Sequence, residues 1–101
     1  MLYPKMAKIY IKKPLKDAPE AKVFWLKDGR KLYNLKDLLL TLENMDEEVF
    51  RFHVNPRKND FIRWIKEVLG DKKLARKLRW TTTRQTTIKK LREHLDENYI
   101  W

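Results

Sequence analysis

The chain has 101 residues and a formal net charge of +10. This length suits one domain with a modest hydrophobic core, and the hydrophobic content of 43% favours a folded domain over a disordered segment. Cysteine and serine are absent, which excludes disulfides, cysteine zinc sites, and thiol or serine nucleophiles. The lack of cysteine also favours an intracellular, cytoplasmic location.

Composition narrows the classes of function further. No apolar run approaches the length of a membrane span, and residues 1–13 are too short and too polar for a secretory signal, so we expect no membrane partner. Two glycines are too few for a glycine-rich phosphate loop. We therefore expect no enzymatic activity and no cofactor. Abundant lysine and glutamate are compatible with a thermophilic source.

We expect one domain over residues 1–101, in three parts. Residues 1–21 form an N-terminal extension, in which 6–12 alternate as a short strand and the following prolines mark a loop. Residues 22–97 form the core, and residues 98–101 form a tail where the last helix frays. The expected fold class is α+β and predominantly helical, with a β-hairpin, or three strands, packed on four to five short helices.

Residues 23–33 predict the hairpin. Two apolar runs flank Asp28-Gly29, a dipeptide that adopts positive φ angles in two-residue turns. Such a turn places Trp25 opposite Leu32. Both faces of the hairpin are then partly apolar, so that one face is available to cover the helices.

Three helices are expected over residues 34–45, 46–54 and 59–70. Each begins at an asparagine or aspartate that can cap it. Pro56 ends the second helix, because the residue before proline leaves the α region, and Gly70 suits the C-terminal cap of the third. Apolar residues at spacings of three and four predict the buried faces, which include Leu35, Leu38, Leu39, Leu42, Met45, Val49, Phe50, Phe61, Trp64 and Ile65. Phe52 is expected as a further aromatic anchor of the core.

Two further helices complete the expected fold. Asp71 caps a short basic helix. Thr82 and Gln85 fit the capping-box pattern at the start of the last helix. The inward positions of these two helices are Leu74, Ala75, Leu78, Ile88, Leu91 and Leu95.

Several uncommon residues occur in order over residues 22–78: a DG hairpin, a leucine-rich helix, and then the motifs MDEEVFRFHVN, KNDFIRWI and GDKKLA. This pattern resembles a small prokaryotic domain family of unknown function. The resemblance implies a binding or regulatory module, because such domains occur alone or attached to larger proteins. It also implies one more amphipathic helix after the matched region, and it brings no activity with it.

One cluster of polar residues has two interpretations. His53, Asn55, Asn59 and Asp60 form either a polar site, with His53 and Asp60 as a proton-transfer pair, or a helix break in which His53 fills a half-buried slot. We favour the helix break, because capping explains three of the four residues. The only other histidine, His94, is far away in sequence, so no metal site is expected.

Positive charge is concentrated in one segment. Residues 72–92 carry nine cations and no acid, whereas residues 93–101 carry three acids. This concentration suggests an anionic partner, either nucleic acid or an acidic protein. We expect a non-catalytic module that binds the backbone of DNA or RNA, single- or double-stranded, with an aromatic stacking surface. The expected binding residues are Lys72, Lys73, Arg76, Lys77, Arg79, Trp80, Arg84, Lys89 and Lys90.

Three alternatives stay open. Residues 72–92 have the layout of a helix-turn-helix, although Arg79 replaces the turn glycine and Gln85 occupies an apolar position. In the second alternative, the basic segment is a solvated lysine-rich surface that binds no partner. The third alternative is a protein-interaction or regulatory accessory domain that uses the hairpin edge and a surplus of aromatic residues. That surplus consists of Tyr3, Tyr10, Phe24, Tyr33, Trp80, Tyr99 and Trp101.

Overall fold

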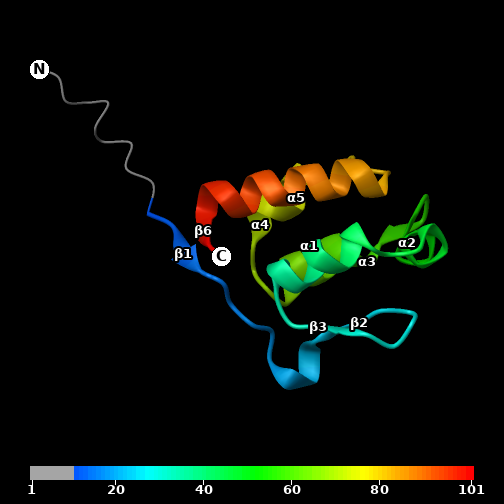
Figure 1. Ribbon diagram of the computed structural model, residues 1–101, viewed down its shortest axis with the longest axis horizontal. Helices are drawn as coiled ribbons and strands as arrows, with labels where there is room; N and C mark the ends of the chain where they lie inside the picture. Colours follow the sequence, from blue (N-terminus) through cyan, green and yellow to red (C-terminus); the bar gives the residue numbers. More distant parts are fainter. Residues whose placement is uncertain (1–10) are drawn as a thin grey trace, which may run out of the picture.

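The computed structural model describes residues 11–101 and shows a predominantly helical α+β fold, as expected (Figure 1). Within this range the strands form two-stranded pairs, and none of the helices has the length and apolar character needed to cross a membrane. In chain order the elements are β1 (Lys13–Pro14), the 3-10 helix η2 (Glu20–Lys22), β2 (Phe24–Trp25), β3 (Lys31–Leu32), α1 (Leu35–Glu43), α2 (Glu47–His53), β4 (Val54–Asn55), β5 (Lys58–Asn59), α3 (Asp60–Glu67), α4 (Lys72–Lys77), α5 (Arg84–Asn98) and β6 (Tyr99–Ile100).

The leucine-rich helix α1 lies between two layers of the fold. Figure 1 shows α5 on one side of it and the β2–β3 hairpin on the other. The inward side chains of α1 are fully buried, as the sequence predicts. Each buried leucine contributes about 1.5–3 kcal/mol, so this face holds the layers together. It belongs to one hydrophobic cluster that extends along the chain from Ala18 to Tyr99.

The β2–β3 hairpin differs from the expected one by one residue in register. Its loop comprises residues 27–29, where only Gly29 has a positive φ, of 95°. Trp25 therefore pairs with Lys31 and not with Leu32. Because a one-residue shift turns a side chain to the other face of a strand, Trp25 is 59% exposed. The two-residue turn predicted from Asp-Gly is wrong.

The chain between α2 and α3 forms a second, unexpected hairpin, β4–β5, around Pro56. Asp46 begins α2 without a side-chain hydrogen bond. Asn59 caps α3, since its Oδ1 accepts a hydrogen bond from the Ile62 N–H at 3.0 Å. The proline thus ends α2 as predicted, but the chain reverses direction through backbone pairing as well as through capping.

Phe52 lies outside the core, contrary to the prediction from its sequence position. Its side chain is 45% exposed. The ammonium groups of Lys27 and Lys58 lie 4.8 and 4.7 Å from its ring centre, which is a cation–π arrangement. Phe52 therefore contacts one lysine from each of the two hairpins and does not fill the interior.

Helices α4 and α5 begin at well-formed caps. Asp71 Oδ1 accepts a hydrogen bond from the Leu74 N–H at 3.0 Å, as expected for α4. The cap of α5 is Thr83, whose Oγ1 accepts from the N–H three residues later. The expected capping box of Thr82 and Gln85 is therefore wrong by one residue.

After α5 the chain continues into a short strand, and Tyr99 on this strand belongs to the core. Strand β6 pairs in parallel with β1, and Tyr99 is only 7% exposed. A hydrogen bond also ties the segment before β2 to α3: the Trp64 indole Nε1 donates to the Lys22 carbonyl at 2.9 Å. The expected strand over residues 6–12 falls largely outside the described residues.

The positive φ angle of Gly29 in the hairpin loop can be tested directly. Gly29→Val should lower the free energy of unfolding by about 1–2 kcal/mol, because an L-residue with a side chain is disfavoured at positive φ. Gly29→Asn should lower it less, since asparagine tolerates this region better. Equal stability of both variants and the parent protein in denaturant titrations would show that Gly29 does not need a positive φ.

Candidate functional site

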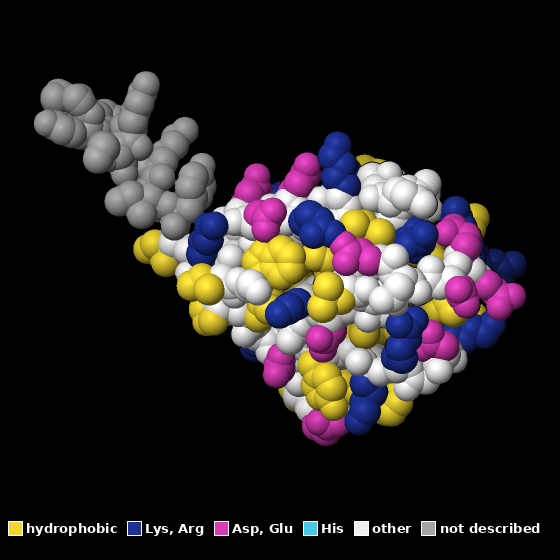
Figure 2. All heavy atoms as spheres, in the orientation of Figure 1, with side chains coloured by type: hydrophobic (Ala, Val, Ile, Leu, Met, Phe, Trp, Pro, Cys, Tyr) yellow, Lys and Arg dark blue, Asp and Glu magenta, His cyan; other side chains and the backbone are white. Residues whose placement is uncertain are grey.

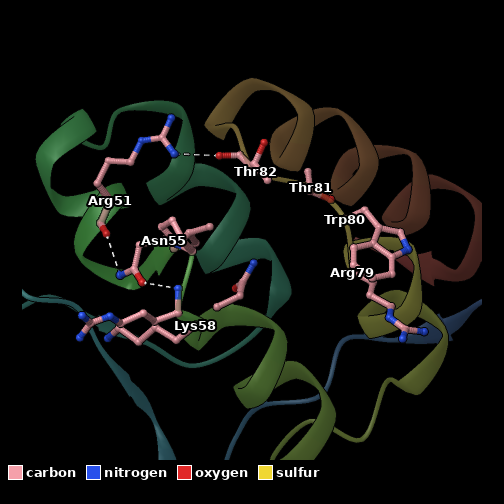
Figure 3. Close-up of a pocket in the computed structure, with 11 residues that line it drawn as sticks. Arg51, Asn55, Lys58, Arg79, Trp80, Thr81 and Thr82 are labelled. Carbon is pink, nitrogen blue, oxygen red and sulfur yellow. Dashed lines mark hydrogen bonds between the residues drawn. The ribbon is translucent and has the colours of Figure 1, made fainter.

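A cleft of about 510 Å³ lies between the β4–β5 hairpin and the segment that joins α4 to α5. Figure 3 shows Arg51, Asn55 and Lys58 on one side and Arg79 and Trp80 on the other. We call it the cationic cleft, because four of its lining residues are cations and none of these described residues is acidic. The lining residues are Arg51, Val54, Asn55, Pro56, Arg57, Lys58, Asn59, Arg79, Trp80, Thr81 and Thr82.

The hairpin side of the cleft is shaped by Asn55. Its Oδ1 accepts a hydrogen bond from the Arg57 N–H at 3.0 Å, and its Nδ2 donates to the Arg51 carbonyl at 3.2 Å. An asparagine that bonds its own backbone two residues later defines a tight turn. The turn places Arg57 and Lys58 side by side at the rim.

The opposite side is the break between α4 and α5. Leu78 and Thr81 are both buried, and the Thr81 N–H donates to the Leu78 carbonyl at 3.0 Å. Two anchored residues thus flank a turn that projects Arg79 and Trp80 outward. Trp80 is 79% exposed, and the guanidinium of Arg79 lies 4.8 Å from its ring centre.

Arg51 connects the two sides of the cleft. Its Nη1 donates to the Thr82 carbonyl at 3.0 Å, so helix α2 is tied to the segment before α5 (Figure 3). Its Nε also pairs with Glu47 at 3.1 Å. The hydroxyl of Thr81 is buried at this end and has no hydrogen-bond partner among the described residues, which leaves a polar group unsatisfied beside the cleft.

The cations of the cleft are not equally available. Lys58 Nζ pairs with Asp60 at 2.7 Å, and Arg51 is shared with Glu47. Arg57 and Arg79 have no carboxylate within 4 Å in the described part of the chain. These two guanidinium groups therefore offer the free positive charge of the site, one on each side.

Other hollows on the surface mix charges of both signs. One contains Lys12 and Lys73 together with Asp96 and Glu97. Another has Lys77 and Lys90 next to Glu93 and Glu97. Figure 2 likewise shows basic and acidic side chains intermixed over one face of the molecule. A local excess of positive charge therefore distinguishes the cationic cleft from these hollows.

The structure distributes the nine predicted binding residues over several surfaces. Arg79 and Trp80 line the cationic cleft. Lys77, Arg84 and Lys90 are used internally: Lys77 contacts His94 and Glu97, Arg84 donates to the Leu42 carbonyl, and Lys90 donates to the Lys77 carbonyl. The remaining residues are exposed and outside the cleft, namely Lys72, Lys73, Arg76 and Lys89.

The arrangement at the start of α5 bears on the helix-turn-helix interpretation. That motif needs the first turns of the second helix free to reach bases. Thr87 is 2% exposed, and the Arg84 guanidinium is bonded to Leu42 at 2.6 Å and lies near Glu47. These contacts pack the first turn of α5 against α1 and α2, so two of its side chains are not available to DNA.

Sequence reasoning missed Arg51, Arg57 and Lys58 as members of the site. They lie in a segment whose charges nearly cancel, so a count along the chain does not single them out. The available signal is the Asn-Pro-Arg-Lys sequence. A turn of that composition projects consecutive cations, but only the fold brings them opposite Arg79.

Behind the hairpin side, His53 joins three elements. The Lys27 N–H donates to its Nε2 at 3.0 Å, so Nδ1 carries the proton and donates to Asp60 at 2.9 Å. Burial by itself would raise the pKa of Asp60, but hydrogen bonds from Lys58 and His53 outweigh it and lower that pKa. Since His53 is buried with both nitrogens engaged, its geometry is that of a structural connector.

Near the C-terminal end of α5, Asp71 accepts hydrogen bonds from three elements. Its Oδ2 receives His94 Nε2 at 2.8 Å and the Tyr99 hydroxyl at 2.6 Å, while Oδ1 caps α4. Burial alone would raise the pKa of Asp71, but these bonds outweigh it and hold the pKa well below its usual range. Burial and the adjacent carboxylate raise the pKa of Tyr99.

The comparisons with known proteins leave the chain without a relative to name. No family model, no curated protein and no solved structure matches it. The resemblance to a small prokaryotic domain family therefore stays a prediction.

The buried Asp71 carboxylate predicts a specific pH dependence. A folded-state pKa below the unfolded value of about 3.9 contributes stability that is present above that pH and is lost as the pH falls through the folded pKa. Asp71→Asn should lower the free energy of unfolding at pH 7 by about 1.5–3 kcal/mol and weaken its decline below pH 4. Urea titrations at several pH values measure both effects.

The matched control is Asp46→Asn, because Asp46 is exposed and makes no side-chain capping bond. This variant should keep the stability and the acid profile of the parent protein. If Asp71→Asn behaves like Asp46→Asn, the hydrogen-bond network around Asp71 contributes nothing to stability.

Proposed function

We propose that this protein is a non-catalytic binding module that binds nucleic-acid backbone at the cationic cleft. The observation that carries the proposal is a cleft lined by Arg51, Arg57, Lys58 and Arg79, with no acidic residue among its described lining residues. Phosphates are bound by such clusters, because arginine donates two parallel hydrogen bonds to a phosphate and keeps its charge at any physiological pH.

Electrostatics favours this cleft over the wider basic segment. Arg57 and Arg79 line opposite sides of the cleft and have no carboxylate partners among the described residues, whereas Lys77, Arg84 and Arg92 contact Glu97, Glu47 and Glu43. A cation that already has an acidic neighbour gains less from a phosphate. The net charge of +10 adds long-range attraction toward any polyanion. The cleft then determines where on the protein the polyanion binds.

The salt dependence of binding tests the proposal. The protein should bind labelled oligonucleotides at low salt, and the affinity should fall with a log–log slope of about −0.7 per phosphate contact for single strands and about −0.9 for duplex. Arg57→Glu with Arg79→Glu should reduce the affinity more than tenfold and make the slope shallower by about two contacts. Fluorescence anisotropy at several salt concentrations measures both.

Two matched pairs control for the change in net charge. Lys36→Glu with Lys66→Glu places the same charge change on exposed residues outside both the cleft and the segment 72–92. Lys72→Glu with Lys89→Glu places it within that segment but outside the cleft. Both pairs should weaken binding far less than the cleft pair. Equal losses in all three would mean that overall charge and not the cleft binds the nucleic acid.

A second candidate function, as a protein-interaction or regulatory accessory domain, is favoured by the hairpin. Trp25 is 59% exposed on β2, and Lys31 on the paired strand lies over its ring at 5.2 Å. Among the described residues this hairpin is a two-stranded sheet, and an edge strand of such a sheet can pair with another chain. A partner with an extended, acidic segment suits this surface.

Self-association measures the strength of this second candidate. If the hairpin surface binds protein through apolar burial, the chain should form dimers at high concentration with little salt dependence. Trp25→Ala should then return it to a monomer without affecting oligonucleotide affinity. Sedimentation that shows a monomer up to high concentration, in the parent and the variant alike, would remove the support for self-association through this surface.

A further inference from the structure

Trp80 is held in a fixed position although most of its surface is exposed. The residues that flank the Arg79–Trp80 pair, Leu78 and Thr81, are 1% and 6% exposed, and a backbone hydrogen bond joins them. The Arg79 N–H also donates to the Arg76 carbonyl at 3.2 Å. An exposed indole on an anchored turn is a costly feature for stability alone, since the apolar surface stays in water.

One face of the indole is already occupied. The Arg79 guanidinium lies over the ring, 4.8 Å from its centre, and with 79% of the side chain exposed the opposite face has room for a second planar group. Nucleobases stack on aromatic side chains because every base has a π-face. The Arg79 guanidinium also keeps a positive charge close to the ring. A phosphate next to a base stacked on Trp80 can bind this charge.

The size and shape of the cationic cleft favour a single strand over a duplex. Its volume of about 510 Å³ falls in the range of small-ligand sites, about 300–1,000 Å³. Proteins that bind duplex DNA insert a protruding helix or strand into a groove. This site is concave, so only a strand with separated bases can place a base and its phosphates inside it.

The remaining lining residues suit a base edge. Asn59 and Thr82 bring polar groups to the lining of the cleft, whereas the Thr81 hydroxyl is buried next to it. Single-stranded nucleic acid is recognised by this combination, in which a base stacks on an aromatic ring and bonds through its edges.

We propose that the cationic cleft binds single-stranded nucleic acid, with one base stacked on Trp80 and the neighbouring phosphates held by Arg57 and Arg79. This inference rests on the proposed function and names its ligand class. Duplex is then bound only through its backbone at the rim and more weakly. The stacked base, rather than the backbone alone, sets the preference for single strands.

The test compares three oligonucleotides of one length and sequence: a single strand, the corresponding duplex, and a single strand with abasic sites that keeps every phosphate. Each is prepared as DNA and as RNA. The parent protein should bind at least one of the intact single strands about 5- to 150-fold more tightly than its abasic form, which is the range for one stacked base.

Variants of Trp80 assign the stacking to this residue. Trp80→Ala should lower the affinity for the intact single strand by that same factor. It should leave the affinity for the abasic strand unchanged and change the affinity for duplex less than twofold. Trp80→Phe should restore most of the lost affinity, because phenylalanine still stacks. Trp25→Ala is the matched control, since Trp25 is exposed outside the cleft, and it should bind like the parent protein.

The outcomes separate this inference from the proposed function. If duplex, intact strand and abasic strand all bind with similar affinity and Trp80→Ala changes none of them, the protein binds backbone only and the stacking inference is overturned. If none of the oligonucleotides binds at low salt, the proposed function itself fails. Thermal melting of Trp80→Ala should match the parent protein, because the exposed side chain contributes little to folding.

Discussion

The carboxylate of Asp71 is the interaction on which the geometry of the fold depends most. It accepts hydrogen bonds from the start of α4, from His94 on α5 and from Tyr99 on β6. A buried charge is tolerated only when its oxygens are fully hydrogen-bonded, so these elements take positions that satisfy it. The break that presents Arg79 and Trp80 lies between the two helices that Asp71 connects.

His53 has a similar role behind the β4–β5 hairpin, which forms one side of the cationic cleft. It receives a backbone N–H from the loop of the β2–β3 hairpin and donates to Asp60 at the start of α3. Arg51 joins the two sides of the cleft through the Thr82 carbonyl. Binding to a site that is already in place costs less conformational entropy than ordering a loop does.

The distribution of carboxylates, more than the number of cations, shapes the surface of this protein. The acids of α1, α2 and α5 lie close to Arg92, Arg84 and Lys77 and reduce their pull on an anion. Arg57 and Arg79 lack such neighbours among the described residues. The exposed cations Lys72, Lys73, Arg76 and Lys89 lie outside the cleft, so what distinguishes the cleft is that its cations share one concave lining without an acidic residue.

The class of the fold and most of the helices can be predicted from the amino-acid sequence. The leucine spacing in α1, the capping residues Asn34, Asn59 and Asp71, and the glycine after α3 act over a few residues, so local chemistry suffices to predict them. The same local rules failed where two conformations are close in energy. Asp-Gly fits both two- and three-residue loops, and three successive threonines can each cap α5.

The contacts between residues distant in sequence could not be predicted, because they depend on how the elements pack. The cationic cleft joins Arg57 and Arg79 from segments with different net charge, and no count along the chain pairs them. Tyr99 and His94 look like ordinary positions in a terminal helix until the fold brings Asp71 to both. Local sequence specifies which elements form, because their energetics are short-ranged. The cleft depends on packing between elements, and that is fixed only once the buried polar groups of the whole core are satisfied.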